Sequence, residues 1–431
     1  MNQDATVSLR HGVSYGLLGL PLAFVALPLY VLLPNHYARE FGMPLATLGA
    51  VLLLARLFDA FSDPLLGRLS DRLFAHSRRA VLGVGGVSAV ILALGMQGLF
   101  FPRVSSPEAL RYWALGCLLV VYTAYSQLSI AHQSWGARLG GGELHQGRIV
   151  AWREGLGLVG VLLAAVLPSL LGLSVMIAVL ALALAMGWLA WSQAPEPHRP
   201  ETAVPGASIA SFWHPWKQAD FRRLLAVFML NGIASAIPAT LVLFFIQDRL
   251  QAPATQEPLF LGAYFLSAAV SIPLWLRAVA RWGLARTWLA GMLLAIAVFA
   301  WTAGLGQGDA TAFLIVCALS GVALGTDLAL PSALLAGVIA KRGDQGRLEG
   351  AYFGWWNLAT KLNLALAAGL ALPLLDVLGY TPGGRDPDAL RTLGLAYAVL
   401  PCALKLAAAS ALYFLLIRNP SGQSLLPKGH S

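Results

Sequence analysis

Long apolar runs follow one another along this chain and constrain its fold more than any other feature. A helix of about 20 apolar residues crosses the hydrocarbon core of a bilayer, and in lipid a helix satisfies its own backbone polar groups. We therefore predict an all-α, polytopic membrane protein. Its twelve transmembrane helices are drawn from the approximate spans 14–34, 45–67, 80–101, 110–133, 152–172, 174–193, 222–246, 258–277, 286–306, 312–339, 350–375 and 392–417.

The composition excludes a water-soluble protein. The chain is 58% hydrophobic and 11% charged, and its mean hydropathy is +0.70. A soluble domain has about 25% charged residues. This chain has too few charged residues to cover a surface that faces water.

The distribution of basic residues predicts the orientation of the helices. Of the 29 Lys and Arg residues, 20 lie in the loops and tails on one side of the twelve spans and 6 lie in the loops on the other side. Basic residues accumulate in cytoplasmic loops, so we expect a bacterial inner (plasma) membrane protein with both termini in the cytoplasm. The same spread of basic residues over short loops accounts for the net charge of +9, and we expect no nucleic-acid partner.

The chain is predicted to divide near its middle. Residues 194–220, which are rich in Pro, Ala and Ser, are expected to form a cytoplasmic linker. The linker would separate a six-helix half at 1–193 from a second half at 221–418, which a cytoplasmic tail at 419–431 follows.

The two predicted halves also share short motifs. "DPLLGRLSDR" from Asp63 has a counterpart 209 residues later in "IPLWLRAVAR" from Ile272, and "QGRIVAWREGLG" from Gln146 has one in "QGRLEGAYFGWW" from Gln345. Matching loops in two six-helix halves are typical of transporters built from parallel repeats.

Two carboxylates, Asp59 and Asp63, lie four residues apart inside the second apolar span, and Arg56 precedes them on the same helix face. An ionised side chain at the bilayer centre costs at least about 2.5–3.5 kcal/mol. A bound cation or proton relieves the repulsion between two carboxylates. We predict a site for Na⁺ or H⁺ at Asp59 and Asp63, to which the Ser62 hydroxyl contributes. The alternative is a structural ion pair in which Arg56 neutralises one Asp.

Other polar residues also fall inside the spans. Lys361 requires a carboxylate or a substrate anion, unless it extends to the inner membrane surface. Asp327 is expected to pair with Lys361, to line a cavity or to have a structural role. His132 is either a proton relay or a hydrogen-bonded structural residue, and Lys405 is expected to extend its ammonium group to the membrane surface. Asn357 would line a cavity beside Lys361 or bind neighbouring helices.

The segment "GRLSDR", Gly67–Arg72, is predicted to be a cytoplasmic hinge. Gly67 permits the close approach of another helix, and Asp71 with Arg72 could hold a charge network that forms and breaks as the halves move. The alternative is that the arginines only set the topology.

The chain carries no Walker motif and no catalytic triad, and its three Cys residues lie in apolar runs without spaced pairs. We expect neither an enzyme nor a cofactor. Transport would be driven by a coupling ion, Na⁺ or H⁺, and not by ATP.

The segment "ARLFDAFSDPLLGRLSDR" resembles the second helix of the glycoside–pentoside–hexuronide:cation symporters, the melibiose-permease-like branch of the major facilitator superfamily. "SYGLLGLPLAF" from Ser14, "GARLGGGELHQGRIVAWREGLGLVG" from Gly136 and "GAYFGWWNLATKL" from Gly350 are similar to helix one, to helix five with its preceding loop, and to helix eleven of that family. The resemblance covers most of the chain. It implies the major facilitator fold and cation-coupled transport by alternating access.

The resemblance also implies site residues. Asp59, Ser62 and Asp63 would bind the coupling cation together with a hydroxyl from helix four, which by position is Ser126, with Thr123 one turn away. Residues expected at the substrate cavity are Tyr15, Ala23, Ser129, Gln133, Arg153, Asp327, Asn357 and Lys361.

The chain departs from the sugar-carrying members at the sugar-binding positions. Those members have acidic residues on helices one and four and a stacking aromatic on helix four, where this chain has Ala23, Ser129 and Gln133. The predicted substrate is a sugar, a glycoside-like molecule or another small organic solute. A lysophospholipid or another amphiphile is the alternative, because Arg153 and Lys361 suit an anionic or zwitterionic head group.

A receptor or scaffold that transports nothing would not need the carboxylates of Asp59 and Asp63 inside a span. The expected partners are therefore the substrate, the coupling cation and the lipid bilayer. We expect the protein to be a monomer.

Overall fold

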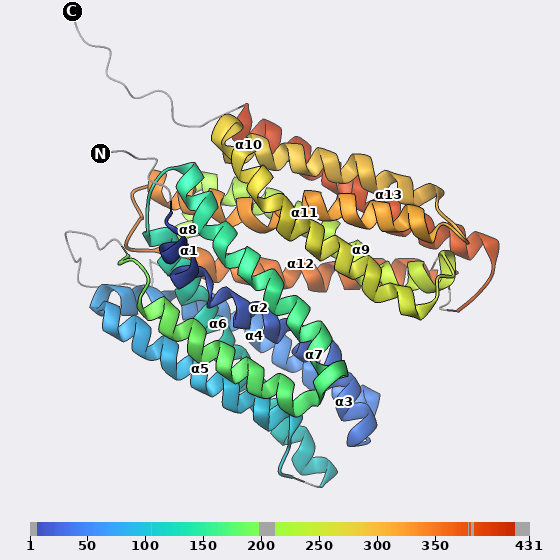
Figure 1. The fold of residues 1–431 in the computed structure, drawn as a ribbon, viewed down its shortest axis with the longest axis horizontal. Coiled ribbons are helices and arrows are strands. Elements are labelled where there is room, and N and C mark those ends of the chain that lie inside the picture. The colour runs from blue at the N-terminus through green and yellow to red at the C-terminus, as the bar shows by residue number, and fades with distance from the viewer. Residues whose placement is uncertain (1–6, 105, 198–211, 378, 381–382, 419–431) are drawn as a thin grey trace, which may run out of the picture. The chain divides into compact units, whose positions relative to one another are not determined.

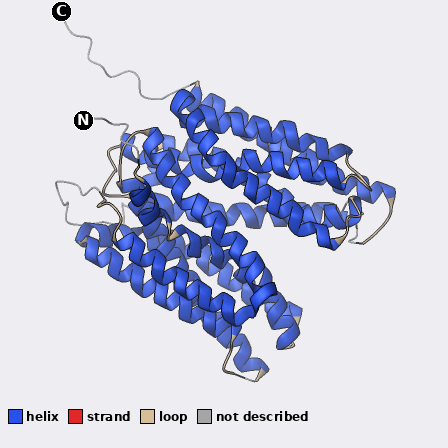
Figure 2. Ribbon diagram, in the orientation of Figure 1, coloured by secondary structure: helices blue, strands red, loops and turns tan. Residues whose placement is uncertain are grey.

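The computed structural model describes residues 7–104, 106–197, 212–377, 379–380 and 383–418, and the secondary structure within these ranges is helical (Figures 1 and 2). The chain forms two compact units. The first comprises Met1–Pro215 with Ile339–Leu358, and the second comprises Trp216–Val338 with Ala359–Ser431. Residues 198–211 of the predicted linker and the predicted tail 419–431 lie outside the described residues.

Three helices of the first unit begin at a serine that caps them. Ser8, Ser77 and Ser106 each accept a hydrogen bond from the backbone N–H three residues later, at 3.2, 3.0 and 3.2 Å, which satisfies a free donor of the first turn. The helices are α1 (Leu9–Gly16), α2 (Gly19–Leu27), the π-helical turn η1 (Pro28–Leu32), α3 (Leu33–Glu40), α4 (Leu45–His76), α5 (Arg78–Phe100), α6 (Pro107–Arg138) and α7 (Glu143–Ser192). The short helix α8 (His214–Lys217) contains the point in the sequence at which the first unit ends, at Pro215, and the second begins, at Trp216.

The second unit contains α9 (Ala219–Phe244), η3 (Phe245–Arg249), η4 (Ala254–Gln256), α10 (Glu257–Phe299), η5 (Ala300–Gly304), α13 (Pro387–Leu412) and η6 (Tyr413–Ile417). Two helices belong to both units. α11 (Ala310–Lys341) lies in the second unit as far as Val338, and α12 (Glu349–Val377) lies in the second unit from Ala359 onward. The intervening segment, Ile339–Leu358, is therefore a part of the first unit that comes from late in the sequence.

Two glycines interrupt the longest helices. Gly172 in α7 has φ 82° and Gly283 in α10 has φ 75°. Residues that have a Cβ rarely adopt a backbone conformation with such a positive φ. Gly172 separates the predicted fifth and sixth spans, and Gly283 separates the predicted eighth and ninth spans.

The twelve predicted spans fall almost entirely within helices. Among the described residues, eight helical segments are long and apolar enough to cross a membrane, and one of them, Glu257–Gly304, covers the predicted span 258–277 and nearly all of the span 286–306. α4, which carries Arg56, Asp59 and Asp63, is not among the eight.

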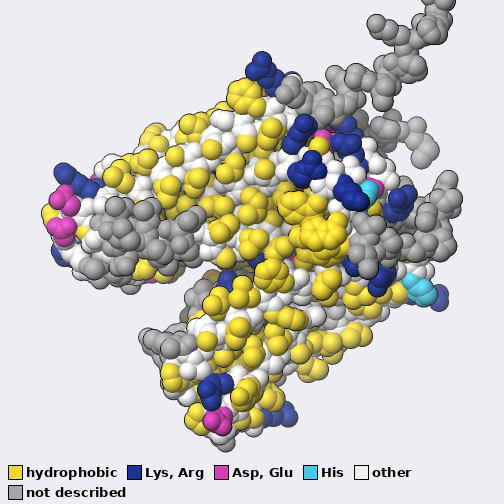
Figure 3. Space-filling model, turned by 180° about the vertical axis from the view of Figure 1, so that it is seen from behind, with side chains coloured by type: hydrophobic (Ala, Val, Ile, Leu, Met, Phe, Trp, Pro, Cys, Tyr) yellow, Lys and Arg dark blue, Asp and Glu magenta, His cyan; other side chains and the backbone are white. Residues whose placement is uncertain are grey.

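Each unit packs its own aromatic core. In the first unit the rings of Trp135 and Trp191 meet with centroids 5.2 Å apart, and in the second unit Phe245 stacks on Tyr397 at 4.2 Å. Apolar side chains also cover outward faces of the helices (Figure 3). Leu170, for example, is 71% exposed. Such extensive exposed apolar surface is expected where the surroundings are lipid.

We predict that the interruption of α7 depends on the conformational freedom of Gly172. The Gly172→Ala substitution should lower the free energy of unfolding by about 1–3 kcal/mol, because this backbone conformation is strained for any residue with a Cβ. The melting temperature of the detergent-solubilised protein measures the effect. Gly116→Ala is the matched control, because Gly116 lies in a regular part of α6 and a Cβ there meets no atom within 4 Å. Equal melting temperatures for the two variants would contradict the prediction.

Candidate functional site

Both carboxylates of the predicted cation site are buried in the first unit. Asp59 is 3% exposed and Asp63 is 0% exposed. The Ser126 hydroxyl of α6 donates a hydrogen bond to Asp59 Oδ1 at 2.9 Å. The structure thus brings together Asp59 and Ser126, two of the residues that the family resemblance implied for this site.

The other two predicted hydroxyls bind backbone carbonyls of their own helices. Ser62 Oγ donates to the Asp59 carbonyl oxygen at 2.9 Å, and Thr123 Oγ1 donates to the Leu119 carbonyl oxygen at 2.7 Å. A hydroxyl held in this way keeps its lone pairs. Among the described residues, no group of three or more His, Cys, Asp and Glu residues could hold a metal ion. A cation at Asp59 and Asp63 would therefore need hydroxyl or carbonyl oxygens as its further ligands.

Tyr15 and His132 bind each other's backbone carbonyl oxygens and thereby link α1 to α6. The Tyr15 hydroxyl donates to the His132 carbonyl oxygen at 3.1 Å, and His132 Nε2 lies 2.8 Å from the Tyr15 carbonyl oxygen. Their ring centroids are 4.4 Å apart, and the two residues are 2% and 0% exposed. A carbonyl oxygen only accepts, so Nε2 carries a proton in this contact. This arrangement is the one expected of a hydrogen-bonded structural histidine, which is one of the two predicted roles.

Three residues predicted for the substrate cavity lie together in the first unit. Gln133 Nε2 donates to Ser129 Oγ at 2.9 Å and also lies 3.4 Å from Asn357 Oδ1. Ser129 and Gln133 come from α6, and Asn357 comes from the part of α12 that belongs to this unit. The result is a cluster of neutral donors and acceptors. Ala23 of α2 lies near α7, where a Cβ at Gly157 would be 3.3 Å from the Ala23 Cβ.

Arg153 pairs with its neighbour in the sequence, Glu154, which is not among the predicted site residues. Its Nε and Nη2 donate to Glu154 Oε1 at 2.9 and 2.5 Å, and Arg153 is 9% exposed. The Glu154 carboxylate therefore neutralises much of the positive charge that was predicted for the cavity. The sequence already indicates this pair, because Glu154 directly follows Arg153.

The predicted hinge contains a buried charge network at the end of α4. Asp71 accepts hydrogen bonds from the backbone N–H of Gly350 at 2.7 Å and of Ala351 at 2.8 Å. Arg138 Nη2 lies 2.9 Å from both Asp71 Oδ1 and Glu349 Oε2. Burial raises the pKa of the Asp71 carboxyl above its usual range, while Arg138 and the two backbone N–H groups oppose that shift. Asp71 thus binds the N-terminus of α12, where the helix dipole favours an anion.

Two glycines let α4 and α12 approach each other within the first unit. A Cβ at Gly67 would overlap the carbonyl oxygen of Gly350, and a Cβ at Gly350 would overlap that of Gly67. Of the three predicted gating residues, Gly67 and Asp71 contact α12, whereas Arg72 is exposed. Arg138, which is not among the predicted gating residues, provides the cation of the network.

The second unit has a buried ion pair of its own. Lys405 Nζ donates to Asp327 Oδ2 and to Ser235 Oγ, both at 2.9 Å, and Trp288 Nε1 donates to Asp327 Oδ1 at 2.8 Å. Lys405 is 8% exposed. The prediction that Lys405 extends to the membrane surface is wrong, because Asp327 provides a counter-ion inside the helix bundle. Lys361 lies half-buried on the part of α12 that belongs to the second unit.

Comparison with known proteins gives a family and a fold. A family model described as "MFS/sugar transport protein" matches residues 13–419. A candidate sulfoquinovose importer of Salmonella typhimurium is 27% identical over 465 residues, which cover 95% of this chain and 89% of that protein.

Solved structures agree with this chain over nearly its whole length. The fucose:proton symporter of Escherichia coli matches with a TM-score of 0.68 and 15% identity over 93% of this chain and 98% of that one. A bacterial homologue of the iron transporter ferroportin, in an outward-facing state, matches with a TM-score of 0.69 and 16% identity over 93% and 100%. At such low identities the likeness is one of fold, which is the major facilitator fold.

We predict that Arg138 stabilises the network at the end of α4. The Arg138→Gln substitution would leave Asp71 and Glu349 without the cation between them, and removing one partner of a buried pair costs about 3–5 kcal/mol. The melting temperature in detergent should fall accordingly, and Glu349→Gln in the same chain should recover part of the loss. Arg72→Gln is the control, because Arg72 is exposed beside Asp71 and should change stability by less than about 0.5 kcal/mol. Similar losses in the two single variants would refute the assignment.

Proposed function

Because this chain belongs to the family of MFS/sugar transport proteins, we propose that it is a cation-coupled symporter that carries a small sugar-like solute across the bilayer by alternating access. It is a multi-pass membrane transporter and not an enzyme. The main support for coupling to a cation is that Asp59 and Asp63 are both buried on one face of α4, in a segment predicted to cross the membrane.

The two carboxylates provide the coupling site. Ionised groups inside the membrane are costly, and two of them also repel each other, so the empty site favours uptake of Na⁺ or of a proton. The Ser126 hydroxyl donates to Asp59 at 2.9 Å and so holds that carboxylate in position. A membrane potential of 100 mV contributes about 2.3 kcal/mol for each charge moved, which corresponds to about 50-fold accumulation.

The cluster of Ser129, Gln133 and Asn357 supports a hydroxylated substrate. Its hydroxyl and amide groups can donate to and accept from sugar hydroxyls, and they carry no charge. The description of the family and the name of the Salmonella typhimurium relative, a candidate sulfoquinovose importer, point to the same class. Arg153 would meet an acidic group of the substrate, with Glu154 as its resting partner. No observation favours the amphiphile alternative.

We assign the role of a gate to the Asp71 network. Asp71 and Arg138 hold the start of α12 in the first unit, and α12 continues from there into the second unit. Release of Gly350 and Ala351 would free α12 to move, so we assign the closed network to one access state and the open network to the other. In the orientation predicted from the basic loops, this network lies on the cytoplasmic side.

We predict that Asp59→Asn and Asp63→Asn each abolish uphill transport. The amide has no negative charge to balance the cation and no titratable group to take up a proton, so accumulation driven by an ion gradient in proteoliposomes should fall from as much as about 50-fold to none. Uptake at a series of Na⁺ concentrations and pH values measures the loss. Asp388→Asn is the control, because the Asp388 side chain is 89% exposed at the start of α13. Uptake that keeps its cation dependence in both site variants would disprove the coupling site.

The substrate class is tested separately with the unmodified protein. Binding of sulfoquinovose, glucose, melibiose and a lysophosphatidylcholine is measured by calorimetry with and without Na⁺. We expect a sugar to bind and the lysolipid not to bind. An acidic sugar that binds more tightly than its neutral counterpart, with the preference lost in Arg153→Gln, would support the role of Arg153. Binding of the lysolipid alone would overturn the sugar class and leave the cation site intact.

A further inference from the structure

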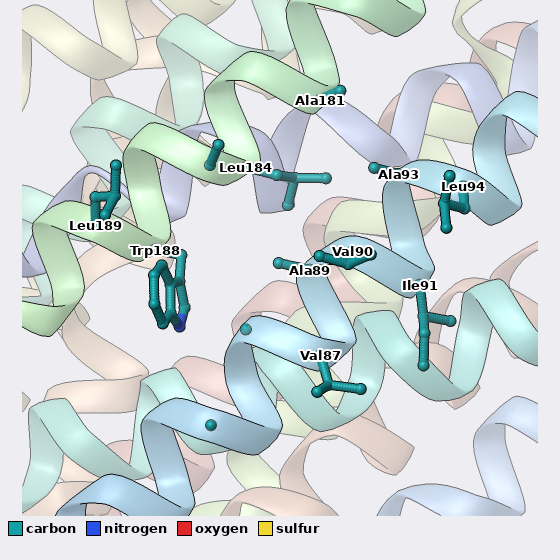
Figure 4. Close-up of a pocket in the computed structure, with 13 residues that line it drawn as sticks. Val87, Ala89, Val90, Ile91, Ala93, Leu94, Ala181, Leu184, Trp188 and Leu189 are labelled. Atoms are coloured by element: carbon teal, nitrogen blue, oxygen red, sulfur yellow. The ribbon is translucent and has the colours of Figure 1, made fainter.

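An apolar groove lies on the outer side of the first unit, between α5 and the second part of α7 (Figure 4). Its volume is 670 Å³. Val87, Val90 and Leu94 of α5 and Leu189 of α7 line it and are 52–66% exposed, so the groove opens to the surroundings of the unit. Both helices are long and apolar enough to cross a membrane.

The shape of the groove follows from small residues beside one large one. Gly83, Gly86 and Ala93 of α5 leave space, and Leu184 and Trp188 project from α7 beside it (Figure 4). The Trp188 indole Nε1 donates to the Leu82 carbonyl oxygen at 2.9 Å, which fixes the ring as one wall. Sequence and packing thus produce a preformed hollow.

The residues that line the groove favour a hydrocarbon chain as its ligand. Sites for small polar ligands combine apolar walls with a few convergent polar groups. Here every lining residue is apolar, and the indole N–H of Trp188 already has a partner. From Gly83 to Leu94 the groove follows α5 for about 16 Å. That is about half of a hydrocarbon core of about 30 Å, the length available to one acyl chain in one leaflet.

Basic residues mark one end of the groove. Arg79 is exposed and precedes Gly83 by one helical turn, so it shares the helix face that carries Gly83, Val87, Val90 and Leu94. Arg78 lies beside it and ties this end of α5 to the end of α7, because its Nη2 donates to the Ser192 carbonyl oxygen at 2.6 Å.

We propose that this groove is a binding site for a resident anionic phospholipid, with one acyl chain in the groove and the phosphate against Arg79. The lipid is a structural ligand and not the cargo, because the groove opens to the outer side of the first unit and the cluster of Ser129, Gln133 and Asn357 does not line it. In the predicted orientation the site lies in the cytoplasmic leaflet.

The test is native mass spectrometry of the full-length protein released from nanodiscs that contain equal amounts of phosphatidylglycerol and phosphatidylcholine. We expect a retained phosphatidylglycerol. Gly83→Leu should remove it, because Gly83 lines the groove and a Cβ there meets no atom within 4 Å, so the added side chain occupies the space of the acyl chain. Gly116→Leu makes the same change at an equally open position on α6 and should retain the lipid.

Arg79→Gln tests the head group and, because Arg79 is exposed, does not depend on the fold tolerating a groove-filling side chain. It should reduce the preference for phosphatidylglycerol over phosphatidylcholine about fivefold, since a basic residue beside anionic lipid contributes about 1 kcal/mol. Arg103→Gln, beyond the other end of α5, should keep the preference. Equal lipid retention in the two glycine variants, an equal preference in the two arginine variants, or a dimer without lipid that Gly83→Leu dissociates would overturn the proposal.

Discussion

Water is absent from the hydrocarbon core of a bilayer, so each polar group within it must find its partner inside the protein. This constraint explains why the described chain is helical, since a helix satisfies its own backbone. It also explains why buried charges occur in small networks. Asp327 binds Lys405, Ser235 and Trp288 in the second unit, and Asp59 binds Ser126 in the first.

The buried networks differ in what they could do. The Asp327–Lys405 pair joins residues of α11 and α13 in one unit, and its carboxylate receives donors on both oxygens. Such a pair favours a single packing of these helices. Asp71 binds through backbone N–H groups at the end of a helix, and such bonds can be exchanged for water when the helix end moves. Asp59 and Asp63 lie on one face of α4, which suits the binding of a small cation.

Glycine determines where these helices bend and where they meet. Gly172 and Gly283 adopt positive φ and divide α7 and α10. Gly67 and Gly350 remove the side chains that would hold α4 and α12 apart, which brings Asp71 within hydrogen-bonding distance of the α12 N-terminus. On the outer side of the first unit, Gly83 and Gly86 open the groove beside Trp188. In each case the absence of a Cβ sets the position of a helix, a network or a cavity.

The sequence alone determined the class of the protein, the positions of its helices and the family to which it belongs. These properties depend on local hydropathy, on the cost of charge in lipid and on motifs that can be read along the chain. The pairing of Ser126 with Asp59 came from the family resemblance and not from spacing. The tertiary structure decided which partners meet: Asp71 binds Arg138, 67 residues away, and the Gly350 N–H, 279 residues away, and Asp327 binds Lys405, 78 residues away. The periodicity of a helix predicts contacts only between residues three or four positions apart, and not between residues so far apart in the sequence. Lys405 was therefore expected at the membrane surface, and Arg138 and Glu349 were missed, because a charge is assigned a partner only when the packing of the helices is known.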